Sequence, residues 1–185
     1  MLSIEKCAVP PQALLSKYSL DGMYADSFRT EIIGQVPLAV FVFAFYTTWL
    51  FKIEQFILAH IAQRPSNDIQ ARELADGAIN KFAAWNVESR NDNQLLMCDM
   101  LGRTRSWFMV NHMATENNKK THLYFGSAVV PKKKPKTGKS SLGIVFLILL
   151  GFHKIYSFLL LYLARQKVAR AYQQVTDLHK QLPPL

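Results

Sequence analysis

The chain has 185 residues, of which 50% are hydrophobic and 19% charged, and its formal net charge is +9. This length suffices for one domain with a hydrophobic core, and the positive charge points to an anionic partner or surface. The two cysteines, Cys7 and Cys98, are too few for a disulfide framework or a cysteine-based metal site, and they suggest a reducing compartment. The first residues lack the basic segment and long apolar core of a signal peptide, which predicts a cytoplasmic chain.

The first part of the chain predicts an arm, a strand and the start of a helix. Residues 1–23 are mixed in character and contain a pair of prolines, so we expect an irregular arm with one short helical turn. Residues 24–33 mix small polar residues with aromatic and aliphatic ones, a pattern typical of a strand. The strand should end at Gly34, and Pro37 suits the first turn of a helix that begins at Leu38.

The uncharged run of residues 32–51 is long enough to be a transmembrane candidate. Gly34 and Pro37 should break it, because the residue before a proline is biased away from the helical conformation. The remaining helical part, residues 38–51, spans about 21 Å, whereas a hydrocarbon core is about 30 Å thick. We therefore favour a buried pair of helices. The alternative is an integral membrane protein that spans at 32–51 and 143–163 and acts as a scaffold or complex subunit.

A short polar helix is predicted between residues 64 and 80. Ser66 or Asn67 can cap its start, Asp68 lies in its first turn, and Gly77 can end it. The helix would lead from the apolar segment into the next part of the chain.

Residues 81–130 have the pattern of an antiparallel meander, because four runs of β-branched, aliphatic and aromatic residues alternate with polar turn sequences. The predicted turns lie at 91–93, 101–103 and 116–120, where Asn, Asp, Gly and Lys gather.

The period of two along a strand places Trp85 and Val87 on one face of their run. In the same way, Arg105, Trp107 and Met109 share a face of the third run. Both faces carry apolar residues, so either face can lie against the core.

Residues 131–141 predict an exposed basic linker, because they combine two prolines with like charges. Each lysine near an anionic bilayer contributes about 1 kcal/mol to the free energy of binding, so the linker could contact a membrane surface. The alternative is a solvated loop. Nucleic acid is disfavoured because no aromatic residue interleaves with the lysines. The sequence at 136–141 ends like a phosphate loop, but Lys133 occupies the position of its first glycine. The predicted membrane-surface residues are Lys132, Lys133, Lys134, Lys136 and Lys139.

A long helix is predicted from Leu142, with no proline before Pro183. His153 and Lys154 interrupt its apolar stretch near the middle. A central lysine costs about 3 kcal/mol on the membrane-insertion scale, and surrounding apolar residues each return about 0.5 kcal/mol, so insertion and a core helix over a sheet both remain open. In the core-helix interpretation, His153 is a buried histidine and Lys154 extends to solvent.

Residues 82–110, 123–131 and 149–160 resemble a small uncharacterised bacterial family with the pattern of a helix-grip domain, the superfamily of START and polyketide-cyclase-like (SRPBCC) domains. The resemblance covers about residues 24–165. It implies an α+β fold in which an antiparallel meander sheet wraps on a long C-terminal helix, with a helical insertion after the first strand. The sequence predicts five strands, whereas the superfamily usually has six or seven. The resemblance brings no catalytic residues.

The expected organisation is an arm at 1–23, one helix-grip-like domain at 24–172 that contains the linker at 131–141, and a C-terminal tail at 173–185. In such a fold the sheet and the last helix enclose a cavity for a hydrophobic ligand. The predicted ligand-binding residues are Trp85, Arg105, Trp107, Tyr124, His153 and Tyr156.

The resulting hypothesis is a non-catalytic accessory protein, without cofactor, that binds an apolar small molecule or lipid at the inner membrane surface. The integral membrane protein described above is one alternative, and an enzyme of the cyclase or dehydratase type that uses polar cavity residues is the other.

Two further groups of residues have simpler interpretations. Asp99 is expected to form a cross-strand ion pair with Arg103 or Arg105. His112 and His122 lie near facing ends of neighbouring strands, but two histidines without a nearby carboxylate or cysteine are a weak metal signal.

Overall fold

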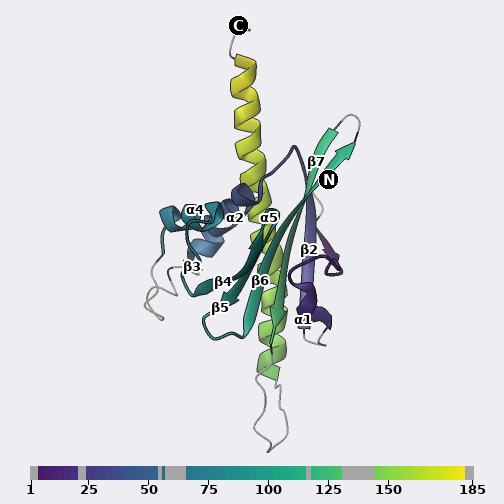
Figure 1. The fold of residues 1–185 in the computed structure, drawn as a ribbon, viewed down its shortest axis with the longest axis vertical. Coiled ribbons are helices and arrows are strands. Elements are labelled where there is room, and N and C mark those ends of the chain that lie inside the picture. The colour runs from purple at the N-terminus through teal and green to yellow at the C-terminus, as the bar shows by residue number, and fades with distance from the viewer. Residues whose placement is uncertain are drawn as a thin grey trace, which may run out of the picture.

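The computed structural model describes residues 4–20, 24–53, 56, 66–115, 118–130 and 144–181, apart from the side chains at 20, 114, 115, 118, 144–154 and 174–181. Within these residues, a seven-stranded antiparallel sheet forms the centre of the molecule. Helices pack against one of its faces and the N-terminal arm packs against the other (Figure 1). The predicted α+β class, with an antiparallel meander and a long C-terminal helix, is confirmed.

The elements have the following bounds in chain order. The strands are β1 (Glu5–Cys7), β2 (Tyr24–Ile33), β3 (Lys81–Phe82), β4 (Trp85–Asn91), β5 (Gln94–Asp99), β6 (Thr104–Thr115) and β7 (Asn118–Val129). The helices are α1 (Ser16–Leu20), α2 (Leu38–Tyr46), α4 (Asp68–Asp76) and α5 (Ile144–Gln181).

The strands lie side by side in the order β1-β2-β7-β6-β5-β4-β3. β2 pairs with β7 along its whole length, from Tyr24 opposite Val129 to Ile33 opposite Lys120. From β3 to β7, each strand pairs with the next one along the chain. The strand predicted at residues 24–33 is therefore confirmed, and it joins the meander through the last strand.

The sheet has two short strands that the sequence did not predict. β1 has 3 residues and adds to the edge of β2. β3 has 2 residues, and Ala83, with φ at 50°, turns the chain between β3 and β4. The turns predicted at 91–93 and 101–103 are confirmed, and Gly102 takes a positive φ of 68° in the second of them.

The uncharged run at 32–51 is divided, as predicted. β2 ends at Ile33, α2 begins after Pro37, and α2 ends at Tyr46 after only 9 residues. The break at this end comes earlier than expected because two hydroxyls bond back to helix carbonyls: Thr47 to Phe43 at 2.6 Å and Thr48 to Phe45 at 2.9 Å. Residues 49–53 then resume a helical conformation.

No helix in the described ranges has the length and apolarity needed to cross a membrane.

Helix α4 follows its predicted boundaries. The Asn67 side chain accepts the backbone N–H of Gln70 at 2.9 Å, and the Gln70 side chain accepts the backbone N–H of Asn67 at 3.2 Å. This reciprocal pair is a capping box. The helix ends at Gly77, whose φ of 83° is the left-handed conformation that glycine adopts without strain.

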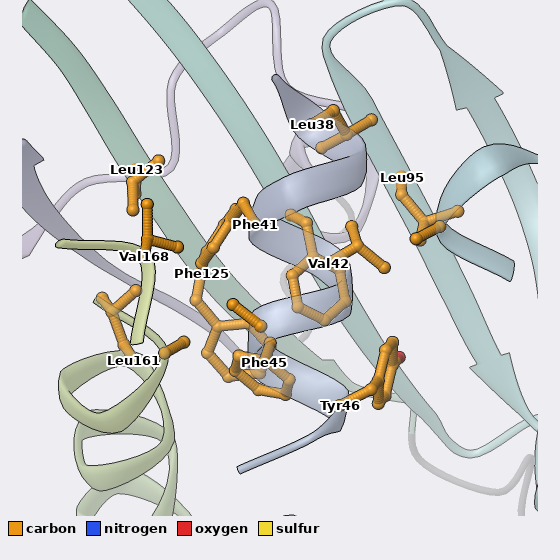
Figure 2. Packing of buried hydrophobic residues seen from close by; sticks show 14 of the residues in the cluster. Leu38, Phe41, Val42, Phe45, Tyr46, Leu95, Leu123, Phe125, Leu161 and Val168 are labelled. Carbon is orange, nitrogen blue, oxygen red and sulfur yellow. The ribbon is translucent and has the colours of Figure 1, made fainter. Parts of the chain in front are cut away.

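An aromatic core fills the space between α2 and the sheet. The ring of Phe45 lies 4.8 Å from that of Phe108 and 4.6 Å from that of Phe125, so one helical residue contacts two neighbouring strands. Figure 2 shows Phe41, Phe45 and Tyr46 directed from α2 into this core, with Leu161 of α5 at its side. Core aromatics of this kind each contribute about 3–5 kcal/mol relative to alanine.

Helix α5 has 38 residues and lies on the same side of the sheet as α2, against β2 and β7 (Figure 1). Its polar anchors are to backbone carbonyls: Arg165 Nε donates to Glu31 at 3.1 Å, Lys167 Nζ donates to Thr47 at 3.1 Å, and Tyr172 donates to Gln35. The helix continues through residue 181, so most of the tail expected at 173–185 is helical.

The N-terminal arm covers the opposite face of the sheet. Its residues Ala13, Leu15 and Tyr18 pack on a second buried cluster that includes Trp107 and Tyr124. The expected short helical turn is α1, which has 5 residues. The sheet therefore has a hydrophobic core on both faces, which explains why neither face looked solvent-exposed in the sequence.

Candidate ligand-binding site

The two faces of the sheet divide the predicted ligand-binding residues. Trp85 and Tyr156 border the core on the helix side. Trp107 and Tyr124 belong to the core beneath the N-terminal arm. Arg105 is two residues from Trp107 in β6, so its side chain points to the same face. The expectation that these residues line one pocket with α5 is wrong, because the pleat sends alternate side chains of β6 and β7 to opposite faces.

The remaining predicted site residues lie outside the described side chains. His153 is part of α5, but its side chain is not described. The basic linker at 131–141, with the residues predicted to contact a membrane and the sequence resembling a phosphate loop, lies outside the described residues. These proposals remain sequence-based.

On the arm side, buried Gln94 ties the arm to the sheet. Its side-chain oxygen accepts the backbone N–H of Leu14 at 2.8 Å and the indole N–H of Trp107 at 2.9 Å. Its amide nitrogen donates to the carbonyl of Gln12 at 3.1 Å. Trp107 therefore has a structural partner for its polar atom, and it anchors the arm.

A charged cluster beside this core is centred on Glu88. One carboxylate oxygen accepts from Lys17 at 2.6 Å and from Tyr18 at 2.5 Å, and the other accepts from Arg105 at 2.9 Å. Burial raises the pKa of Glu88, but these three hydrogen bonds outweigh it and leave the pKa below its ordinary value. Because three donors occupy the carboxylate, the cluster fits a clasp that holds α1 to β4 and β6.

Cys98 lies next to this clasp, opposite Arg105 in the pairing of β5 with β6. Burial raises the pKa of its thiol above the ordinary value. A raised pKa keeps the thiol protonated and unreactive at neutral pH, which is the reverse of what a nucleophilic cysteine requires.

The ion pair expected for Asp99 takes a different form. Its carboxylate accepts the backbone N–H groups of Arg103 at 2.6 Å and Thr104 at 3.1 Å, so it closes the turn between β5 and β6. The guanidinium of Arg105 in β6 instead reaches Glu88 in β4, across the one intervening strand β5. Short acidic side chains commonly bond their own turn in this way.

The two histidines of the meander have local partners. His112 Nδ1 lies 3.2 Å from the hydroxyl of Thr121, and His122 Nε2 lies 3.4 Å from the carboxylate of Glu31. In the part of the chain that the structure describes, no three histidine, cysteine or acidic residues gather closely enough to hold a metal ion.

On the helix side of the sheet, a carboxylate is buried. Asp26 is only 3% exposed, and its two carboxylate oxygens accept from Ser127 at 2.6 Å and from Tyr24 at 2.8 Å. Burial and, after it, the bond to Asp26 raise the pKa of Tyr24 well above its ordinary value. Ser106, opposite Ser127 in β6, is also buried, so polar residues of β2, β7 and β6 form a row.

Ser157 lies on the buried side of α5, which also carries Leu160, Leu161 and Ala164. Its side chain is 1% exposed, and its hydroxyl has no hydrogen-bond partner among the described residues. The ring centroid of the neighbouring Phe158 lies 6.3 Å from that of Phe28, which is two residues after Asp26 in β2 and on the same face. We call Tyr24, Asp26, Ser106 and Ser127 the inner polar cluster. The cluster and the buried Ser157 of α5 are the candidate site.

The sequence contained a partial signal for this cluster. In β2, alternate positions carry Tyr24, Asp26, Phe28, Thr30 and Ile32, so a carboxylate falls on a predominantly apolar face. That pattern identifies Asp26 as a buried carboxylate once the face covered by the helices is known. Because both faces of the sheet carry apolar residues, the sequence did not show which face that is. Ser157 carried no such signal, because a single serine is ordinary in a helix.

Comparisons of the chain with protein-family models, with curated proteins and with solved structures gave no match.

Proposed function

We propose that the protein binds an apolar small molecule or lipid between the inner face of the sheet and α5, in a helix-grip arrangement and without catalysis. The observation that carries the proposal is the inner polar cluster on the sheet together with the buried Ser157 of α5, whose hydroxyl has no hydrogen-bond partner among the residues that the structure describes. A buried polar group without a partner costs about 1–3 kcal/mol. A ligand that reaches this layer with one polar atom would recover that cost. Apolar walls with a few convergent polar groups are the usual form of a small-molecule site.

The topology supports the helix-grip part of the proposal. β2 is separated from the meander by α2 and α4, and it returns to the sheet by pairing with the last strand, β7. The long helix α5 then follows β7 and packs against β2 and β7. This order places the sheet and the last helix face to face, as the resemblance of the sequence implies.

An exposed apolar surface on α5 supports a location at a membrane surface. Ile155, Phe158 and Leu159 are 63%, 40% and 41% exposed, and their spacing of three and four residues places them on one side of the helix. The basic linker at 131–141 comes shortly before this helix in the chain. Apolar side chains beside clustered lysines are typical of a surface that docks on anionic lipid.

Ligand binding is tested by thermal unfolding of the full chain with fatty acids, fatty alcohols, isoprenoids and quinones. A ligand at a hundred times its Kd adds about 2.7 kcal/mol to the free energy of unfolding. Ser157→Leu should abolish the shift, because the larger side chain occupies the ligand's space. Trp107→Phe is the matched control: it changes the core on the arm side and should retain the shift. The proposal is wrong if no ligand class shifts unfolding or if both variants respond alike.

Membrane docking is tested separately with vesicles. Wild-type protein should sediment with vesicles that contain anionic lipid, more strongly at low salt, because screening lengths shorten to about 8 Å at physiological ionic strength. Exchange of the five linker lysines for glutamine should remove the salt-sensitive part. Phe158→Ser should weaken the remainder. Equal sedimentation with neutral and anionic vesicles would argue against the electrostatic contact.

A further inference from the structure

The turn between β5 and β6 presents two neighbouring apolar side chains to solvent. Met100 is 50% exposed and Leu101 is 72% exposed. Turns usually carry Gly, Asn, Asp or Ser, because these residues tolerate the turn conformation or bond their own backbone. Gly102 supplies the positive φ of this turn, so its conformation does not require apolar residues at the two positions before it.

Hydrogen bonds hold this turn in one conformation. The backbone N–H of Met100 donates to the carbonyl of Ala84 at 2.9 Å, and that of Gly102 donates to the carbonyl of Asp99 at 2.9 Å. The carboxylate of Asp99 accepts two further N–H groups of the turn, and the guanidinium of Arg105 donates to the carbonyl of Gly102. The two apolar side chains therefore stand on an ordered frame, which lowers the entropy cost of binding through them.

Positive charge lies next to this turn. Arg103, which ends the turn, is exposed, and its carbonyl accepts the backbone N–H of Val130 at 2.8 Å. Lys132, the first of the five linker lysines, follows Val130 by two residues, so its backbone lies within about 7 Å of Val130. The acidic residue of the turn, Asp99, bonds the turn itself. The apolar pair thus has basic neighbours both in the turn and across the sheet end.

Helix α5 runs alongside β2 in the same direction. The ring centroid of Phe158 lies 6.3 Å from that of Phe28, whereas Arg165, seven residues later, donates to the carbonyl of Glu31, three residues later in β2. Seven helical residues rise about 10 Å, and three strand residues span about the same length. The start of β2, at Tyr24, is therefore level with about residue 149 of α5.

The first residues of α5 consequently project beyond the sheet at the end where the turn lies. Tyr24 pairs with Val129, and Val129 pairs with Thr104, the first residue of β6 after the turn. Figure 1 shows the helix beginning beyond this end of the strands. Residues 144–149 are all aliphatic or aromatic. We call the turn at 100–103, Val130 and residues 144–149 the docking end.

We propose that the docking end inserts into the surface of an anionic lipid bilayer, with Met100 and Leu101 entering the acyl boundary and with β2 and α5 standing upright on the membrane. The proposal rests on the proposed membrane location, and it adds which residues enter the bilayer and how the molecule is oriented. Apolar side chains with basic neighbours match the interface of an anionic bilayer. A second copy of the chain is a poorer occupant, because it would bring two sets of linker lysines together.

The experiment measures binding of the full chain to vesicles of phosphatidylglycerol mixed with phosphatidylcholine. Leu101→Ser should weaken binding by roughly 3- to 10-fold, as expected for a leucine that is partly buried on insertion. Arg103→Gln should weaken it by up to roughly 5-fold at low salt, the contribution of one basic residue near an anionic surface. Ile33→Ser is the matched control, because Ile33 is also 72% exposed but lies at the other end of β2, about 30 Å away, and it should bind like the wild type.

A pair of tryptophan variants tests the same orientation by a gain of binding, which a folding defect cannot imitate. Leu101→Trp should bind the vesicles more tightly than the wild type, because tryptophan favours the membrane interface. Its fluorescence should also be quenched by phospholipids brominated on the acyl chains. Ile33→Trp should show neither effect beyond the quenching that the three native tryptophans give in both variants.

The outcomes separate this proposal from the proposed function. If the wild type binds anionic vesicles and Leu101→Ser binds equally well, membrane docking stands and the upright orientation is overturned. If Phe158→Ser alone weakens binding, the flank of α5 faces the bilayer and the orientation is again overturned. If Leu101→Ser instead dissociates a dimer in size-exclusion chromatography and leaves vesicle binding unchanged, a second copy covers the turn. If the wild type binds no anionic vesicles, the membrane location itself fails, whereas ligand binding is decided by the unfolding experiment above.

Discussion

The side-chain oxygen of Gln94 accepts the indole N–H of Trp107 at 2.9 Å in a fully buried position, and the same oxygen holds the backbone of Leu14. One side chain therefore joins two strands of the sheet to the arm that covers them. The relationship makes the arm part of the folded core, because its release would break the bonds of Gln94 to the Leu14 N–H and the Gln12 carbonyl and would expose the apolar surface around Trp107.

Gln94→Leu should therefore destabilise the protein by about 2–4 kcal/mol, since it leaves the buried indole N–H of Trp107 and the half-buried N–H of Leu14 without their acceptor. Urea unfolding of the variant measures the loss. Amide exchange at Leu14 should accelerate more than exchange in α2, because the arm loses its anchor. Gln12→Ala, at an exposed position of the same arm, is the control and should unfold like the wild type. Equal exchange at Leu14 in both variants would contradict the anchoring role.

A second prediction concerns acid stability through Glu88. Its pKa is lowered in the folded state, because hydrogen bonds from Lys17, Tyr18 and Arg105 outweigh the effect of burial. A lowered folded pKa contributes stability that is present above the unfolded value, about 4.3, and that is lost as the pH falls through the folded value. The free energy of unfolding should therefore decline below about pH 4.5.

Glu88→Gln should be less stable than the wild type at pH 6 and should lose less stability between pH 5 and pH 3. Urea unfolding at a series of pH values gives both slopes. Asp92→Asn serves as the control, because that carboxylate lies at an exposed turn, and it should keep the wild-type slope. Parallel curves for Glu88→Gln and the wild type would mean that the clasp contributes nothing to acid sensitivity.

The fold was predictable to a large extent because local signals agreed with it. Gly34 and Pro37 disfavour a continuous helix through their own backbone preferences. The cap at Asn67 and the stop at Gly77 likewise depend only on α4 and the residues that flank it. The early end of α2 was not predictable, because it depends on two threonines whose hydroxyls could equally have faced other partners.

The candidate site was harder to predict because it depends on which sheet face α5 covers. Trp107 and Phe108 are neighbours in β6, yet one lies under the arm and the other under α2. When large apolar residues occupy both the odd and the even positions of a strand, the sequence does not show which face lies against the helices. Once the structure supplies that face, Asp26 is evident as an inward carboxylate, and Trp107 is excluded from the layer beneath α5.

The capping box of α4 gives a third prediction. Asn67→Ala removes the acceptor for the backbone N–H of Gln70 and should cost about 1 kcal/mol in the free energy of unfolding. Asn67→Asp should retain most of the stability, because aspartate caps equally well and favours the positive end of the helix dipole. Both are measured by urea unfolding. A loss with Asp as large as with Ala would show that the cap is not what stabilises this helix start.

The close contact between β7 and its surroundings at Gly126 gives the last prediction. A Cβ there would lie 2.8 Å from the backbone oxygen of Asp26, 2.9 Å from Leu15 and 2.9 Å from Trp107. The backbone of β2 cannot yield without disturbing its pairing with β7, so Gly126→Ala should cost about 1–3 kcal/mol or more, as overpacking usually does.

Gly102→Ala provides the comparison, because a Cβ at that position meets no described atom within 4 Å, although the φ of 68° is itself strained for alanine. Its cost should be about 1 kcal/mol, from backbone conformation alone. Combining Gly126→Ala with Leu15→Ala should recover part of the loss relative to the sum of the single changes, since the second change opens space beside the new methyl group. Strict additivity of the two in urea unfolding would show that contact with the arm does not limit the space at Gly126.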